Sequence, residues 1–234
     1  MNNMNEKNLK KIVTHSGNFH TDEVFASAVL ALVHHGQVEV VRSRASEVWA
    51  MGDYVVDVGG VHDRVAGRFD HHQEGGAGVR DNGVPYSSFG LTWKHFGEKI
   101  TGSSYATEMI DKRLAQPVDS GDNGFETFGV HGDVAPFILQ DVVSAFRPAW
   151  NEKRTEDEGF LEAFEVAQKI LAREVLRTQS EEEGKRHAEE AYMRAEDKRI
   201  IVLDDHYLFG HSHPAFNGTA NAIPVAPTCR HQTL

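Results

Sequence analysis

The stretch KIVTHSGNFHTDEVFASAVLALVHHG, residues 11–36, decides the fold. Its first four residues, Lys11–Thr14, form a short apolar run that ends in a glycine-containing loop, as a buried strand does. The segment Asp22–His35 then carries apolar residues at helical spacing and stops before Gly36, which predicts a helix.

The same alternation continues along the chain. Further strands are expected at Val38–Val41 and at Asp53–Val58, the latter closed by Gly59–Gly60. Further helices are expected at Ser87–Phe96, Ala106–Asp119, Pro136–Phe146 and Glu156–Glu196, with an interruption at Gly184, and a last strand is expected at Arg199–Leu203. This order predicts an α/β fold, with a mostly parallel sheet flanked by helices and a helical C-terminal part.

Composition narrows the function classes. The formal net charge is −11. This acidic excess does not suggest a general nucleic-acid binder, because such proteins usually show a basic surface. A single cysteine, Cys229, permits no internal disulfide. There is no apolar run of the roughly 20 residues that a membrane span needs, and no apolar signal-peptide core. We therefore expect a cytoplasmic protein without a membrane partner.

The first chemical motif is His15-Ser-Gly-Asn-Phe-His20-Thr-Asp22-Glu23, which lies where the first strand ends and the helix begins. Ligands of open α/β sheets bind outside the carboxyl ends of strands. Two imidazoles and a carboxylate in one tight turn can converge on a cation. The alternative is a polar loop in which Thr21 or Asp22 caps the helix.

The second motif places Asp57 in an otherwise apolar strand, before Gly59–Gly60. A buried carboxylate is costly unless it is paired or bound to metal, and the alternative is a strand-end Asp that caps a turn. The third motif is Asp70-His71-His72, in which one imidazole can face a metal and its neighbour a substrate, while Asp70 fixes a tautomer. Its alternative is a solvated polar turn.

A fourth motif, Asp119-Ser-Gly-Asp122-Asn-Gly124, is by itself an ordinary loop. The four together are stronger, because three separate strand ends deliver Asp or His to the same edge of one sheet. Mixed His and carboxylate ligation suits Mn²⁺, Fe²⁺, Co²⁺ or Zn²⁺. Six candidate ligands exceed what one ion takes, so two ions that share a carboxylate are the natural solution. Arg42 and Arg44 follow the second strand at this edge, where either a phosphate contact or a solvated surface role is open.

These motifs resemble the MYG proteins, a branch of the DHH phosphoesterase superfamily. The resemblance runs from about Lys11 to Asp205 and includes THSGNFHTDE, VVDVGG, RFDHHQ and DSGDNG in order. It implies a two-metal phosphoesterase of DHH-like fold, since MYG proteins are metal-dependent exonucleases that act on RNA.

By motif matching, the resemblance implies which residues hold the ions. His15, His20 and Asp57 would hold one metal. The other metal would be held by Asp22, Asp57, His71 and Asp122, so that Asp57 bridges the two ions. Asp119 is the substitute for Asp122. His72 would contact the scissile phosphate, and Asp70 would orient a ligand histidine. Asp57, Asp70, His71 and His72 are thus the expected catalytic group, with two Mn²⁺ as cofactors and Mg²⁺, Co²⁺, Fe²⁺ or Zn²⁺ as substitutes.

The chain departs from the superfamily pattern at His20, where an Asp is usual, and at Arg147-Pro148, where Asn-Pro is usual. The resemblance fades after about Tyr207, so we expect the C-terminal substrate region of the family to be missing. The expected organisation is a disordered tail at 1–10, a DHH-like metal-binding core at 11–150, a helical extension with the final strand at 151–205 and an irregular tail at 206–234.

The main functional hypothesis is metal-dependent hydrolysis of a phosphodiester at the end of an RNA or short oligonucleotide. One alternative is a hydrolase of small nucleotides or pyrophosphate. Another is a truncated metal-binding protein without catalysis. The sequence does not determine the oligomeric state, and a dimer is compatible with it.

Overall fold

The computed structural model describes residues 9–125 and 134–207. These residues form two compact units, 1–175 and 176–234, whose boundary falls within the last helix. The expected tails at 1–10 and 206–234 lie almost wholly outside the described residues. None of the described helices combines the length and the apolar composition that crossing a bilayer requires.

The first unit is built on a five-stranded sheet of order β2-β1-β3-β5-β4. Strands β1 (Lys10–Thr14), β2 (Val38–Arg42), β3 (Tyr54–Val56) and β5 (Arg68–Phe69) are parallel, and the edge strand β4 (His62–Asp63) is antiparallel. The predicted α/β class with a mostly parallel sheet is therefore confirmed.

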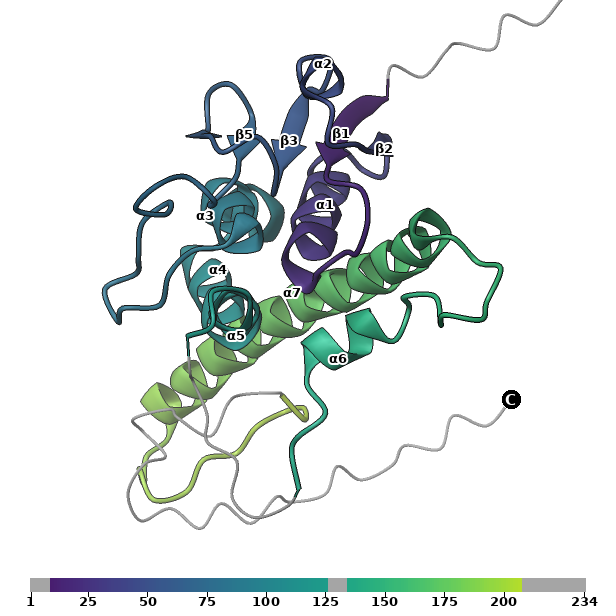
Figure 1. Ribbon diagram of the computed structural model, residues 1–234. Helices are drawn as coiled ribbons and strands as arrows, with labels where there is room; N and C mark the ends of the chain where they lie inside the picture. Colours follow the sequence, from purple (N-terminus) through teal and green to yellow (C-terminus); the bar gives the residue numbers. More distant parts are fainter. Residues whose placement is uncertain (1–8, 126–133, 208–234) are drawn as a thin grey trace, which may run out of the picture. The chain divides into compact units, whose positions relative to one another are not determined.

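Successive side chains of β1 point to opposite faces of the sheet, and each face is covered by helices. Ile12 of β1 packs with residues of α1 (Thr21–Val33) and α3 (Ser88–Thr101), which lie side by side against one face (Figure 1). Its neighbour Val13 faces the other side, where the short helix α2 (Ser46–Trp49) contributes Trp49. The central parts of the strands are thus packed on both faces, and the polar side chains follow at the carboxyl ends of the strands.

A second apolar cluster packs helices against the outer side of α1. It joins α1 to α3, to α4 (Ser104–Ile110), to α5 (Gln116–Asp122), to α6 (Leu139–Ser144) and to the first half of α7 (Glu156–Arg194). Between α4 and α5 the backbone widens into a π-helical turn, η1 (Asp111–Ala115). This packing places the C-terminal end of α5, with Asp122, in reach of the sheet edge.

The structure differs from the sequence predictions in several places. The helix expected at Ala106–Asp119 is instead α4, η1 and α5, and it continues to Asp122. Gly184 does not interrupt α7. The strand expected at Arg199–Leu203 is wrong, because those residues form turns and irregular backbone.

In the second unit, the described residues 176–207 comprise the rest of α7 and the irregular segment that follows it. The ring of Tyr207 stacks on that of His187 with the centroids 4.6 Å apart. The run RIIVL, which predicted a strand at Arg199–Leu203, leaves Ile200 and Val202 exposed and pairs with no strand of the described residues.

Candidate metal centre

The carboxyl ends of three adjacent parallel strands meet at one edge of the sheet. His15 follows β1, Asp57 follows β3, and Asp70-His71-His72 follows β5. Since β3 pairs with both β1 and β5, these residues converge. His15, Asp57, Asp70 and His71 are all buried, whereas His72 is exposed.

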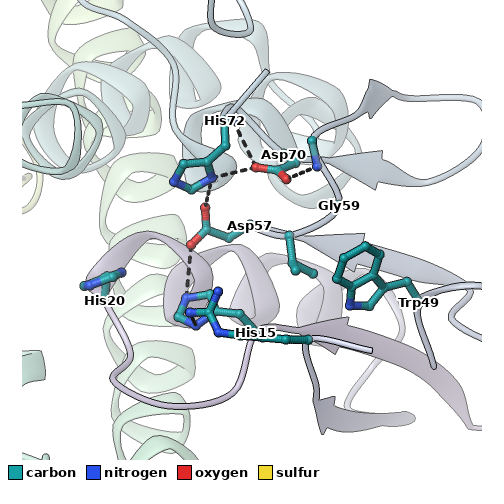
Figure 2. Close-up of a pocket in the computed structure, with 10 residues that line it drawn as sticks. His15, His20, Trp49, Asp57, Gly59, Asp70 and His72 are labelled. Atoms are coloured by element: carbon teal, nitrogen blue, oxygen red, sulfur yellow. Dashed lines mark hydrogen bonds and ion pairs between the residues drawn. The ribbon is translucent and has the colours of Figure 1, made fainter. Parts of the chain in front are cut away.

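Asp57 lies at the centre of this edge. The sequence placed it within the strand, but it follows β3 directly, in the left-handed region at φ +54°. Aspartate tolerates that conformation better than most residues, and the turn aims its carboxylate across the strand ends. One oxygen, Oδ2, lies 3.3 Å from His15 Nε2, and the other, Oδ1, lies 3.3 Å from His71 Nε2 (Figure 2 draws the His15 side).

Three overlapping groups of side chains bring ligand atoms within 4.8 Å of one another. They are His15, His20, Glu23 and Asp57; then Asp57, His71 and His72; and then His20, Asp22 and Asp122. All six residues that the sequence proposed as metal ligands are in these groups. The groups add two residues to those six, namely His72, which the sequence assigned to phosphate contact, and Glu23, which sequence reasoning missed.

Glu23 is fully buried, and its Oε1 lies 3.1 Å from His15 Nε2. Its two oxygens also accept from the backbone N–H of His20, at 2.8 and 2.9 Å. The helix begins at Thr21, so neither Thr21 nor Asp22 occupies the cap position, which belongs to His20. The signal was available, because a glutamate three residues after the cap is a familiar helix start, but it does not reveal the second contact with His15.

The second half of the centre lies around His71. Its Nε2 is 3.0 Å from Asp122 Oδ2 and 3.9 Å from Asp22 Oδ2. Ser88 binds two carboxylates near His71. Its backbone N–H donates to Oδ2 of Asp22, on α1, and its hydroxyl donates to Oδ1 of Asp57, after β3, each at 3.3 Å.

Asp70 does not face the centre. Its Oδ1 accepts from the backbone N–H groups of His71 and His72, at 2.7 and 3.1 Å, and from His72 Nδ1 at 2.8 Å. Its Oδ2 accepts from the backbone N–H of Gly60 at 2.5 Å. Because a carboxylate only accepts, His72 must carry its proton on Nδ1, so that its Nε2 is turned away from Asp70.

Asp119 is not in any of the three groups. Its Oδ1 accepts from the Ser87 hydroxyl at 2.6 Å and the Gly90 backbone N–H at 3.0 Å, and its Oδ2 lies 2.8 Å from Arg80 Nη2. A Cβ at position 90 would lie 1.8 Å from that Oδ2, so the site requires glycine there. Arg80 Nη2 also lies 2.7 Å from Asp111 Oδ1, so Asp119 belongs to a separate ion network. In the three ligand groups, Asp122 alone represents α5.

Three arginines hold the loop of residues 15–20, which we call the ligand loop, from outside. Arg44 Nε donates to the Ser16 carbonyl at 3.0 Å, Arg42 donates to the Gly17 carbonyl, and Arg147 Nε donates to the Phe19 carbonyl at 2.8 Å. These contacts fix three carbonyls of the ligand loop, one of them directly before His20.

Charge at the centre is unbalanced without a cation. Burial disfavours protonation of His15, but the carboxylates of Asp57 and Glu23 outweigh it and raise its pKa to about 10. At His71, burial is likewise outweighed by Asp122 and Asp57, which raise the pKa to about 10. The pKa of Asp22 is raised by burial and by the charges of Asp57 and Asp122, whereas neighbouring imidazoles lower the pKa of Asp57 against the effect of burial.

The donor set fits a divalent metal. His15 Nε2, His71 Nε2 and Asp22 Oδ1 are buried and make no well-aligned hydrogen bond to the residues that the structure describes. Buried polar atoms normally have a partner, and imidazole nitrogens together with carboxylate oxygens are the ligands that first-row divalent metals take. A cation at the centre would satisfy these atoms and neutralise the excess of carboxylates.

The fold and this edge define an α/β protein with a candidate divalent-metal centre at the carboxyl ends of its parallel strands. The chain belongs to the MYG1 exonuclease family, described as "Uncharacterised protein family (UPF0160)", whose model matches residues 11–215. The family expected from the motifs is therefore confirmed.

Relatives carry the same family name. The chain is 33% identical to a MYG1 protein of Schizosaccharomyces pombe, over 86% of this chain and 68% of that protein. It is 34% identical to the human MYG1 exonuclease and 33% identical to that of Mus musculus, in both cases over 68% of this chain. The chain spans about half the length of these two exonucleases, 48% and 47% respectively. No solved structure matched the chain.

Proposed function

We propose that this chain is a metal-dependent phosphoester hydrolase that cleaves phosphodiesters at the ends of RNA or short oligonucleotides, with two divalent ions, Mn²⁺ above others, at a DHH-type site. The names of the human and mouse relatives support the nuclease class. The observation that carries the proposal is the position of Asp57, whose two oxygens face His15 and His71 separately.

In this proposal the ligands divide as the motifs suggest. One ion would be held by His15, His20 and Asp57, and the other by Asp22, Asp57, His71 and Asp122. Glu23 is placed to bind the first ion or to orient His15, since it lies 3.1 Å from that imidazole. When bound, a metal pair lowers the pKa of a water molecule and stabilises charge on the phosphoryl oxygens.

The remaining residues bind and orient the substrate. His72, whose side chain is 61% exposed, is held by Asp70 through Nδ1, so its Nε2 is available to donate to a phosphate oxygen when the ring is protonated. Asp70 keeps that ring oriented and is itself fixed by the Gly60 and His71 backbone. We therefore assign His72 to phosphate contact and Asp70 to its positioning.

Hydrolysis of a short RNA at saturating Mn²⁺ tests the proposal. We expect shortening from one end with release of nucleoside monophosphates. Asp57→Asn should lower the rate by more than about 100-fold, the most that loss of a partner behind a metal ligand usually costs. Asp81→Asn makes the same chemical change on an exposed carboxylate and is the matched control.

Three results would contradict the proposal or redirect it. Full activity in excess chelator would exclude a metal mechanism. Release of inorganic phosphate from small anhydrides, without cleavage of RNA, would favour a nucleotide or pyrophosphate hydrolase. Stoichiometric binding of Mn²⁺ with no turnover of any phosphoester would favour a metal-binding protein without catalysis.

A further inference from the structure

The pocket above the metal centre has a second half that the proposed reaction leaves unassigned. The pocket has a volume of about 550 Å³, which is within the range of small-ligand sites. One part of its lining is the metal centre with His72 and Asp70. The other part holds no candidate ligand, and consists of Arg44, Trp49, Val58, Gly59 and Gly60.

Trp49 forms an aromatic wall in this second half. It ends α2, packs with the apolar cluster of Val13, Val55 and Val58, and donates from Nε1 to the Ser43 carbonyl at 3.0 Å. These contacts hold the indole in one position. Figure 2 shows it on the side of Asp57 opposite His20.

Gly59 leaves the ring uncovered on the side of the pocket. A Cβ at that position would lie 3.6 Å from Trp49 Cε3 and 4.0 Å from Cζ3, so any side chain there would begin in contact with the six-membered ring. Gly59 has φ +100° and Gly60 has φ +68°, conformations that favour glycine. The backbone turn after Asp57 therefore exposes aromatic surface next to the metal centre.

Arg44 adds an exposed positive charge to the same wall. Its Nε donates to the Ser16 carbonyl, and its Nη2 lies 3.2 Å from His15 Nδ1. Its Nη1 makes no hydrogen bond to the residues that the structure describes. The guanidinium is thus anchored beside the centre with donors left over, and guanidinium geometry matches phosphate.

We propose that Trp49 and Arg44 form a nucleoside-phosphate subsite, in which the indole stacks on a nucleobase and the guanidinium binds a phosphate group of the same substrate. This subsite rests on the proposed phosphodiester hydrolysis and assigns its selectivity for nucleotides to residues outside the metal ligands. An aromatic side chain suits this role because stacking on a base tolerates any base identity.

Two chromogenic esters separate the base contact from the chemistry. The p-nitrophenyl ester of thymidine 5′-monophosphate carries a nucleoside, and methyl p-nitrophenyl phosphate does not. In both, water adds to phosphorus and p-nitrophenolate leaves. We expect Trp49→Met to lower the ratio of the two kcat/KM values about tenfold, as loss of one stacked base does. Trp49→Phe should restore most of the ratio, and the exposed Trp150→Met is the matched control. A wild-type ratio in Trp49→Met would overturn the proposal.

A binding measurement keeps this test independent of turnover. The Mn²⁺-loaded protein is titrated with uridine 5′-monophosphate and with ribose 5-phosphate, which lacks the base. We expect the nucleotide to bind about tenfold more tightly in the wild type, and this advantage to vanish in Trp49→Met. Arg44→Gln should weaken both ligands by the same factor. If neither ester is hydrolysed but the nucleotide keeps its advantage, the proposed reaction fails and the subsite stands. Equal affinities in the wild type would overturn the subsite.

Discussion

Asp57 and Asp119 are both buried carboxylates near the same sheet edge, with residue exposures of 4% and 0%, but their partners differ in kind. Asp119 is surrounded by donors, namely Arg80, Ser87 and the Gly90 backbone. Asp57 has imidazoles, which bind metal when neutral, and shares its pocket with further carboxylates. The type of partner, and not burial, separates a structural carboxylate from a candidate metal ligand.

The pKa values of Asp119 and Asp57 also shift in opposite directions. Burial raises the pKa of Asp119 to about 6, although Arg80 and Ser87 act in the opposite direction. At Asp57 the nearby imidazoles outweigh burial and lower the pKa. At the Asp119 site Arg80 supplies a cation that Asp111 shares, whereas the Asp57 site holds several carboxylates whose neutralisation requires protons or cations.

The largest effect on stability is expected at the Asp119 site. Arg80→Met leaves the buried Asp119 without its cation, and breaking a buried pair from one side costs about 3–5 kcal/mol. Urea unfolding of the metal-free protein measures this loss. The double variant Arg80→Met with Asp119→Leu removes both of these buried charges and should recover part of the loss, since Asp111, the other carboxylate bound by Arg80, still loses its cation. A single variant as stable as the wild type would show that the pair is not a structural requirement.

The Asp57 site should instead respond to pH through metal binding. His15 and His71, whose pKa values are about 10, stabilise the metal-free fold fully below pH 6.5 and lose that contribution as the pH rises toward 10. A metal binds the neutral imidazoles, so binding releases their protons. Affinity for Mn²⁺ should therefore rise between pH 6.5 and 8.5, by about tenfold per pH unit for each proton released.

Calorimetric titration in buffers of different ionisation enthalpy counts these protons. Asp119→Asn serves as the comparison, since its carboxylate is outside the three ligand groups and should leave proton release unchanged. An affinity for Mn²⁺ that is flat over this pH range would contradict the protonation of His15 and His71.

The smallest effect, on the affinity for Mn²⁺, is expected for Arg147, which contacts the ligand loop. Arg147 donates to the Phe19 carbonyl, one residue before His20. Arg147→Gln should weaken Mn²⁺ binding by about tenfold, the lower end for a partner that supports a metal ligand. Arg64→Gln, on an exposed arginine, is the matched control. Wild-type affinity in Arg147→Gln would show that the loop carbonyls need no guanidinium to hold His20 in place.

Much of this arrangement could be predicted from local sequence. The apolar runs around Ile12 and Val55 gave the central parallel strands, and ligand-type residues directly after them could be expected at one edge. The helix carrying Asp122 was harder to place, because the π-helical turn at Asp111–Ala115 shifts its end by an amount that no propensity encodes.

Other features depended on contacts between distant residues. Glu23 was not proposed as a ligand, and its approach to His15 follows from the turn between β1 and α1. The resemblance implied Asp122 as a ligand with Asp119 as its substitute, and the donors from Arg80 and Gly90 now set Asp119 apart. The strand expected at Arg199–Leu203 is wrong because a short apolar run forms a strand only where it can pair and pack, and this run leaves Ile200 and Val202 exposed.

Anomalous diffraction from crystals of the Mn²⁺-loaded protein tests the central claim most directly. The account predicts two peaks about 3.5–4 Å apart, one on each side of the Asp57 carboxylate, the first near His15 and His20 and the second near His71 and Asp122. A single ion, or ions that do not contact Asp57, would contradict it.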